Sequence, residues 1–208
     1  MLYTIFMEVK EEDMQTLTVI VGKTYSGKSY LLKEIEQKGF GHSVILNTTR
    51  PMRDGEVDGV DYYFDEKDEL LKALTEEKCI LTSYNVFENG KRNRWYYALF
   101  LNEILTTDKP IVIIDVDKLN ILINWSVEYC FNIKIVYVDT PLDVIKRRIQ
   151  TSSRNREAFD ETTRRLEDDN RKFTEFDESI KDLELKGSQL RGIDIYKVSE
   201  MKEKLTVR

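Results

Sequence analysis

A glycine-rich segment near the N-terminus constrains this sequence more than any other feature. It has the pattern GxxxxGKS over residues 22–29, follows a β-branched apolar run at 18–21, and precedes apolar residues at helical spacing. The glycines let the backbone curl so that its N–H groups face one anion, and the next helix adds its N-terminal dipole. This pattern between a strand and a helix is the P-loop. The sequence therefore predicts a site for a nucleoside triphosphate.

Individual residues of this loop have predicted roles. We expect the Lys28 ammonium to reach the β- and γ-phosphates of the nucleotide, and the Ser29 hydroxyl to reach Mg²⁺. The cofactor predicted for this site is therefore Mg²⁺. The residues expected to contact the phosphates are Gly22, Tyr25, Ser26, Gly27, Lys28, Ser29 and Tyr30.

The composition is typical of a soluble α/β protein and narrows its partners. The 208 residues are 41% hydrophobic and 34% charged, which suits one domain with its own core. The net charge of −6 argues against general nucleic-acid binding. No apolar run approaches the roughly 20 residues of a membrane helix, and the first residues do not resemble a secretory signal. We expect a cytoplasmic protein with no membrane or nucleic-acid partner, either a monomer or a homodimer.

Cysteine and histidine usage excludes other chemistry. Cys79 and Cys130 each begin an apolar run and are expected to be reduced core thiols. His42 is the only histidine, and no cysteine pair has the spacing of metal ligands. The sequence therefore argues against a zinc site and against histidine-based hydrolysis.

Strands and helices are predicted to alternate along the chain. Strands are expected at 16–21, 43–47, 60–64, 79–86, 93–98, 110–115, 133–138 and 193–198. Helices are expected from the P-loop to Lys38 and at 67–77, 99–106, 117–129, 141–149 and 160–183. Asn89 and Gly90 form the signal of a hairpin turn, and residues 2–9 are a candidate edge strand. Alternation around a P-loop predicts an α/β fold with a doubly wound parallel sheet.

A second group of phosphate-binding side chains lies in the loop at 48–64. Arg50 and Arg53 are three residues apart and can point at one anion, which arginine binds bidentately. The Tyr62 hydroxyl adds a neutral donor. The loop is therefore interpreted as a second phosphate site, with a solvated polar turn as the alternative.

Several motifs in order resemble the guanylate kinase family over roughly residues 17–200. They are GxxxxGKS at 22–29, TTRxxRxGExxGxxYxF at 48–64, a Tyr-Tyr pair at 96–97, IIDVD at 113–117 and an arginine-rich segment after 147. The resemblance implies a P-loop nucleoside monophosphate kinase fold. Its core would be about 16–47, 99–140 and 183–208, its NMP-binding lobe about 48–98 and its lid about 148–165. It also implies phosphoryl transfer from ATP to GMP or dGMP.

The resemblance assigns further roles residue by residue. Asp117 lies where the family places an acid beside the acceptor. Asp115 ends a strand where the sheet opens toward the P-loop, and from that position it could fix Mg²⁺ or its waters. One of the two could instead be a helix N-cap. Arg50, Arg53, Tyr62 and Tyr97 would hold the acceptor's monophosphate. Lid arginines would spread the charge of the transferred phosphoryl group together with Lys28. The candidates in the lid are Arg148, Arg165 and either Arg154 or Arg156, and the alternative for each is a solvated position on a charged helix face.

The sequence departs from the family where the base is read. The family's guanine-binding glutamate aligns nearest Leu81, and its small hydroxyl residue becomes Leu99. Either Glu88 or the polar residues of 82–85 read guanine by another route, or the base differs. The hairpin at 87–95 is either solvated or an additional phosphate or partner contact. A kinase for a non-guanine or modified nucleotide and a non-catalytic binding module therefore remain as alternatives.

Overall fold

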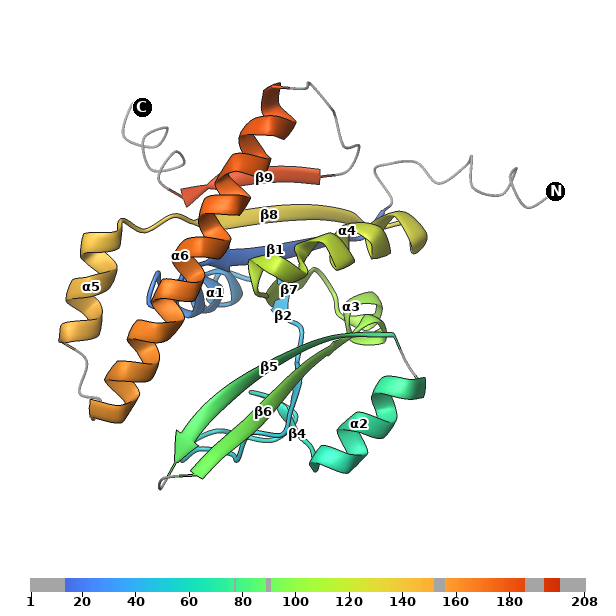
Figure 1. The fold of residues 1–208 in the computed structure, drawn as a ribbon. Helices are drawn as coiled ribbons and strands as arrows, with labels where there is room; N and C mark the ends of the chain where they lie inside the picture. Colours follow the sequence, from blue (N-terminus) through green and yellow to red (C-terminus); the bar gives the residue numbers. More distant parts are fainter. Residues whose placement is uncertain (1–13, 77, 89–90, 152–155, 186–192, 199–208) are drawn as a thin grey trace.

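Two β-sheets form the framework of the structure (Figure 1). The computed structural model describes residues 14–76, 78–88, 91–151, 156–185 and 193–198. The candidate edge strand at 2–9 and the last ten residues lie outside this described set. Within it, no helix is long and apolar enough to cross a membrane.

The larger sheet is parallel throughout and follows the order β2-β7-β1-β8-β9. Its strands are β1 (Thr16–Gly22), β2 (His42–Ser43), β7 (Pro110–Ile113), β8 (Asn132–Val138) and β9 (Ile193–Lys197). Central β1 pairs with two neighbours, so that Val19 lies between Val112 and Ile135. Parallel strands end at the same edge of a sheet, so the residues that follow β1, β7 and β8 share one edge.

Helices cover both faces of this sheet, as the doubly wound prediction requires. Successive side chains of β1 point to opposite faces because a strand has a period of two. Ile20 packs with the apolar residues of α1 (Lys28–Gln37). Val19 and Val21 belong to the opposite core, which includes Leu122 of α4 (Leu119–Glu128) and Phe173 of α6 (Arg156–Leu185). The predicted fold class is confirmed.

The smaller sheet and one helix form a separate lobe next to the parallel sheet (Figure 1). Its strand order is β4-β3-β6-β5, and α2 (Lys67–Glu76) packs on it through Leu70. The strands are β3 (Asn47–Thr48), β4 (Tyr63–Phe64), β5 (Cys79–Glu88) and β6 (Lys91–Phe100). The predicted hairpin is confirmed by antiparallel pairing that runs from Cys79 and Phe100 to Glu88 and Lys91.

The single strand predicted at 43–47 is wrong, because the chain changes sheets within this run. His42 and Ser43 pair with β7 in the larger sheet, whereas Asn47 and Thr48 pair with β6 in the smaller one. Val44 is still buried in the core of the larger sheet. The residues of 43–47 are thus shared between two sheets, but they form one continuous apolar run in the sequence. The hydrophobic pattern alone does not show where one strand ends and the next begins.

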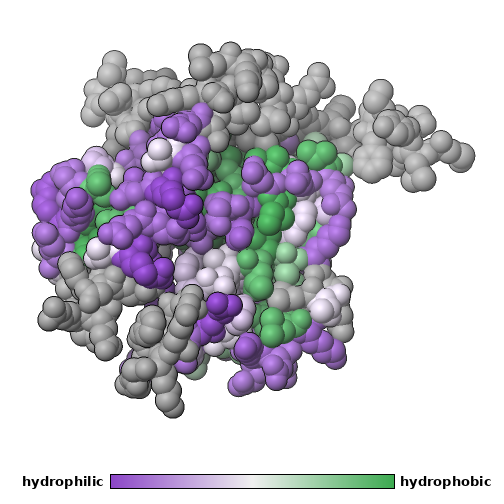
Figure 2. Space-filling view, viewed as in Figure 1, coloured by the Kyte–Doolittle hydropathy of each residue, from purple (hydrophilic) through white to green (hydrophobic). Residues whose placement is uncertain are grey.

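The remaining helices connect the two sheets or flank the larger one. They are α3 (Leu101–Thr106), the 3-10 helix η3 (Val116–Lys118) and α5 (Leu142–Gln150). Figure 2 shows hydrophilic residues over α5 and α6, whereas hydrophobic residues gather over α4. Ile121 and Val127 of α4 are exposed. The boundaries given above for the lobe and the lid stay predictions.

Candidate active site

The P-loop lies between β1 and α1, and it needs glycine at Gly22 because of close packing and at Gly27 because of a positive φ. A Cβ atom on Gly22 would lie 2.8 Å from both the Val138 carbonyl oxygen and Ser26 Oγ. Gly27 has φ 108°, which is unfavourable for other residues. The Ser26 hydroxyl is buried and has no hydrogen-bond partner in the described part of the chain. Such a group is stabilised when a ligand supplies a polar atom.

The Lys28 ammonium curls back over the P-loop. Its Nζ donates hydrogen bonds to the carbonyl oxygens of Gly22 at 2.6 Å and Lys23 at 2.9 Å. Burial lowers the pKa of Lys28, whereas the charges of Asp169 and Asp115 act to raise it. The positive charge is thus held at the loop, where the sequence predicted it.

Arg148 reaches the same loop from α5. Its Nη1 donates to the carbonyl oxygens of Tyr25 at 2.9 Å and Ser26 at 2.8 Å. Thr140, which follows β8, donates its hydroxyl to the Ser26 carbonyl at 2.7 Å. Arg148 therefore holds the backbone of the P-loop.

The other predicted phosphate contacts of this loop differ in exposure. Ser29 is exposed, and Tyr30 is 72% exposed beside it. The Tyr25 side chain instead packs against an apolar cluster that includes Ile145 and Ile149 of α5. Only the backbone of Tyr25 is therefore placed to contact a phosphate.

A cavity of about 380 Å³ opens beside the P-loop at the carboxyl ends of β8 and β9. Two lysines, Lys23 and Lys197, and two carboxylates, Asp139 and Asp177, contribute to its wall. The other lining residues are Tyr137, Val138, Thr140, Pro141 and Leu142. Ligands of open α/β sheets bind at this edge, so the cavity is placed to receive a group attached to phosphates in the loop.

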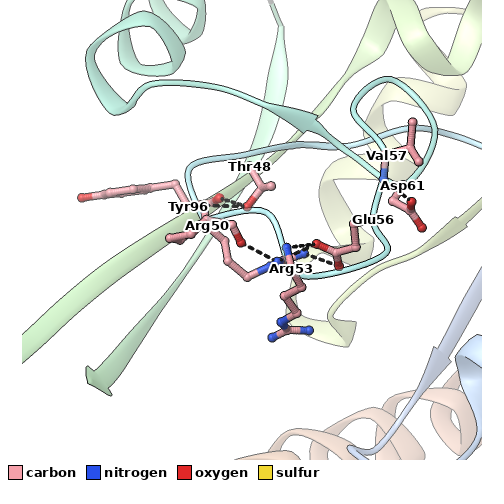
Figure 3. A network of polar contacts seen from close by, with 8 residues as sticks. Thr48, Arg50, Arg53, Glu56, Val57, Asp61 and Tyr96 are labelled. Carbon is pink, nitrogen blue, oxygen red and sulfur yellow. Dashed lines mark hydrogen bonds and ion pairs between the residues drawn. The ribbon is translucent and has the colours of Figure 1, made fainter. Parts of the chain in front are cut away.

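Arg50 lies in the smaller sheet's loop with its charge fully paired (Figure 3). It is only 3% exposed, and its guanidinium contacts both carboxylate oxygens of Glu56 at 2.8 and 2.9 Å. Its Nη1 also donates to the Pro51 carbonyl at 2.7 Å. Burial acts to lower the pKa of Arg50, but the hydrogen bonds and charges of Glu56 and Tyr97 together outweigh it, and the pKa is raised.

Arg53 has a different arrangement. Its backbone N–H donates to Glu56 at 2.8 Å, whereas its side chain is exposed. In Figure 3 the Arg53 side chain points away from the Arg50–Glu56 pair. The two arginines therefore do not converge on one point in this structure, although both belong to the same turn.

A row of three tyrosines leads from Arg50 to the edge of the parallel sheet. The Arg50 guanidinium lies 5.2 Å from the ring of Tyr62. The rings of Tyr62 and Tyr97 pack edge-on with their centres 5.9 Å apart, and the rings of Tyr97 and Tyr84 do the same at 5.6 Å. Tyr84 then donates its hydroxyl to Asp115 at 2.7 Å. The predicted residues Arg50, Tyr62, Tyr97 and Asp115 are thus connected, and Tyr84 completes the connection.

Arg165 covers this row from α6. Its guanidinium lies 4.7 Å from the centre of the Tyr84 ring, which is within the range of a cation–π contact. Arg165 is therefore near both the tyrosine row and Asp115. Of the other predicted lid arginines, Arg154 lies outside the described residues, and Arg156 begins α6 with a side chain that is also outside them.

Asp115 and Asp117 follow β7 but have different surroundings. Asp115 is half-buried, and burial raises its pKa, while the Tyr84 hydrogen bond and the charge of Lys172 act to lower it. Asp115 precedes η3 without a side-chain capping bond, so a simple N-cap does not explain it. Asp117 is exposed and pairs with Lys118 at 3.6 Å and Lys172 at 3.7 Å.

The oxygen atoms of Ser29 and Asp115 are the kind of ligand that Mg²⁺ prefers. No cluster of three or more His, Cys, Asp or Glu side chains suited to a metal occurs among the residues that the structure describes. Mg²⁺ is commonly held by one or two carboxylates together with substrate phosphates. The residues present fit a metal that arrives with a nucleotide.

Comparison with known proteins identifies the family. A family model described as guanylate kinase matches residues 14–191. This chain belongs to the guanylate kinase family. The matched region contains both basic centres described above, at Lys28 and at Arg50.

Individual relatives match a shorter region. The guanylate kinase of Sulfurimonas denitrificans is 35% identical over 104 residues, which are 49% of this chain and 47% of that protein. The guanylate kinase of Schizosaccharomyces pombe is 33% identical over 109 residues, or 50% of each. The match thus spans about half the length of these relatives. A crystal structure of guanylate kinase from Anaplasma phagocytophilum is 14% identical, with a TM-score of 0.49, and covers 93% of this chain and 84% of that chain.

The two leucines that depart from the guanylate kinase pattern lie in apolar surroundings. Leu81 packs with Leu70 and Ala98 below α2, on the face of β5 opposite to Tyr84. Leu99 is 1% exposed and belongs to the core of the parallel sheet. On the face of β5 that points to Asp115, the nearest polar neighbour of Tyr84 is Thr82, which pairs with Tyr97. A carboxylate at residue 81 would therefore face α2.

Sequence reasoning missed three functional candidates of this family member. Tyr84 bridges the lobe and Asp115, Glu56 orients Arg50, and Asp169 of α6 contacts the P-loop. Glu56 is part of the quoted arginine-loop motif and could have been found there. Strand alternation places Tyr84 on the face of Thr82, but no local pattern distinguishes Asp169 on a highly charged helix.

Proposed function

We propose that this chain is a nucleoside monophosphate kinase that transfers the terminal phosphoryl group of MgATP to GMP or dGMP. The observation that carries the proposal is the connection between the two centres that the sequence predicts to bind phosphate. A row of polar and aromatic contacts leads from Arg50 through Tyr62, Tyr97 and Tyr84 to Asp115, whose charge acts on Lys28 of the P-loop. A phosphotransferase needs two anions held close together and in line.

The donor side of the proposal uses the P-loop. Its backbone N–H groups and Lys28 would bind the donor phosphates, while Arg148 keeps the loop in shape through its carbonyl oxygens. Mg²⁺, when bound with the nucleotide, supplies additional positive charge at the phosphates. The adjacent cavity with Lys23 would take the donor's nucleoside.

The acceptor side uses Arg50 and its neighbours. Glu56 fixes the Arg50 guanidinium in one orientation, and the exposed Arg53 is free to turn toward an acceptor phosphate. The hydroxyl groups of Tyr62 and Tyr97 would donate to the same phosphate oxygens. No general base is required, because the attacking phosphate oxygen is already an anion. Arg165 would neutralise charge in the transition state and exclude water.

A second candidate acceptor is a nucleotide with another base. It is favoured by the position of Leu81, which faces α2 and leaves Thr82 as the polar side chain next to Tyr84 on the inner face. Guanine has N–H donors that need an acceptor, and an unmatched buried donor costs about 1–3 kcal/mol. The reaction would be the same, and only the preferred base would change.

The test is coupled ADP release with purified protein, MgATP and a panel of ribo- and deoxyribonucleoside monophosphates. Lys28→Ala serves as the blank, and Lys33→Ala, which changes an exposed lysine of α1, is the matched control. We expect turnover with GMP or dGMP that is lost only in Lys28→Ala. A higher kcat/KM with another base would favour the second candidate. ATP binding with no turnover of any acceptor would contradict both and favour a binding module.

A further inference from the structure

We propose that Asp169 determines which form of the donor the P-loop accepts. Its carboxylate competes with a donor phosphate for the Thr24 N–H, and this competition makes the loop select MgATP over free ATP. The inference rests on the proposed function in one respect, namely that the P-loop holds the phosphates of the donor.

The contact itself joins two distant parts of the chain. Thr24 lies inside the P-loop, and its backbone N–H donates to Asp169 Oδ2 at 2.5 Å, although 145 positions separate the two residues. The N–H groups of a P-loop are the donors that cradle phosphate. A carboxylate oxygen from α6 therefore occupies a hydrogen-bonding position that belongs to the anion site.

The neighbouring residue Asp168 has a different environment and provides a comparison. Its carboxylate is paired within α6, with Arg171 at 2.8 Å and Lys172 at 3.0 Å. Asp169 instead contributes its charge to the loop, because it acts with Asp115 to raise the pKa of Lys28. One helix thus presents two adjacent carboxylates, of which one is neutralised locally and the other faces the nucleotide loop.

Electrostatics determines the consequence of this arrangement. A phosphate oxygen that takes the Thr24 N–H must displace the Asp169 carboxylate or remain within a few ångströms of it, and like charges at that separation repel strongly. The Lys28 charge is shared between this carboxylate and Asp115. Mg²⁺ reduces the negative charge of the triphosphate, so MgATP meets less repulsion than free ATP.

A purely structural role for Asp169 has a different signature. If the carboxylate only holds the shape of the loop, removing its charge changes the affinities for MgATP and free ATP by the same factor. If it selects the donor, the ratio of the two affinities changes. The ratio of dissociation constants is therefore the readout that separates the two roles.

Asp169→Asn is the informative variant, because asparagine keeps an oxygen that accepts the Thr24 hydrogen bond and loses only the charge. Asp168→Asn is the matched control. Isothermal titration calorimetry of the full chain, without acceptor, gives Kd for ATP with excess Mg²⁺ and for ATP with EDTA. We expect Asp169→Asn to tighten binding of free ATP by about tenfold and of MgATP by less. Asp168→Asn should leave the ratio of the two constants unchanged.

An unchanged ratio in Asp169→Asn would overturn the inference, as would an equal loss of affinity for both forms. Thermal denaturation of each variant shows that the fold is retained, and Asp169→Ser provides a second uncharged variant if Asp169→Asn is unstable. Wild-type protein that binds neither form would overturn the proposed function together with this inference. Wild-type binding of ATP with an unaltered ratio in the Asp169 variants would overturn the inference alone.

Discussion

The phenol of Tyr84 donates a hydrogen bond of 2.7 Å to the carboxylate of Asp115, and this contact joins the two sheets. Tyr84 belongs to the long hairpin of the lobe, and Asp115 follows a central strand of the parallel sheet. Arg165 of α6 lies over the same ring. Three separate segments of the chain therefore meet at one side chain, between the P-loop and the arginine loop.

Replacing Tyr84 by phenylalanine tests the strength of this contact. The substitution removes the only hydroxyl donor that Tyr84 offers to Asp115 and leaves the ring contacts in place. We expect a loss of about 1–3 kcal/mol in the free energy of unfolding, because the bond is to a charged group. Chemical denaturation measures it, and Tyr96→Phe, whose ring packs on the α2 side of the lobe, is the control. Equal losses in both variants would contradict a specific role of the Tyr84 hydroxyl.

The buried carboxylate of Asp115 is expected to lower the free energy of unfolding near neutral pH. Burial raises the pKa of its carboxyl in the folded state above the unfolded value of about 3.9, so the folded protein binds the proton more tightly. Asp115→Asn should therefore stabilise the fold at pH values above the raised folded pKa. The gain should vanish as the pH falls below the unfolded value, where both states are protonated.

The same variant should lose activity. We expect Asp115→Asn to lower the apparent Mg²⁺ affinity or turnover by about 10- to 100-fold, as for residues that orient a metal. Denaturation midpoints across pH 3–8, together with Mg²⁺ titrations of activity, provide the measurement. Asp117→Asn, which changes an exposed carboxylate, is the control for the stability effect. If Asp115→Asn is less stable than the wild type at neutral pH, the ionised Asp115 carboxylate does not destabilise the fold, and this prediction is wrong.

Arg148 is expected to support donor binding through the P-loop backbone. Two hydrogen bonds from its charged Nη1 hold the carbonyl oxygens of Tyr25 and Ser26. Arg148→Ala should therefore raise Kd for MgATP by about tenfold, measured by calorimetry. Arg147→Ala is the matched control, since Arg147 forms an exposed pair with Asp143 on the same helix. Equal affinities of the two variants for MgATP would show that the Arg148 hydrogen bonds do not contribute to donor binding.

The two faces of β5 should respond differently to a new carboxylate. Leu81→Glu would place an unpaired charge against Leu70 and Ala98, and we expect it to destabilise the protein by about 3 kcal/mol or more. Thr82→Glu lies on the face of Tyr84 and should retain the fold. It should also raise kcat/KM for GMP relative to other nucleoside monophosphates, in the assay panel described above. A stable Leu81→Glu with increased guanine preference would reverse this assignment.

Local signals in the sequence predicted most of the helices and strands. Glycines at 22 and 27 and the apolar runs at 16–21 and 133–138 depend on near neighbours only, so the P-loop and the central strands were predicted close to their observed bounds. The run at 43–47 was not, because its apolar residues satisfy two different sheets in succession. A hydrophobic residue in the sequence indicates burial, but it does not indicate which part of the protein covers the side chain.

The sequence by itself therefore determined the strand, loop and helix of the P-loop, the turn that contains Arg50 and Arg53, and the place of Asp115 after a buried strand. Only the tertiary structure decided that Glu56 holds Arg50, that Tyr84 reaches Asp115, that Leu81 faces α2, and that Asp169 faces Thr24. The physical reason is the range of the interactions. Backbone conformation and periodicity are set within a few residues, whereas charge pairing and hydrogen bonds between segments arise only when packing brings distant positions together.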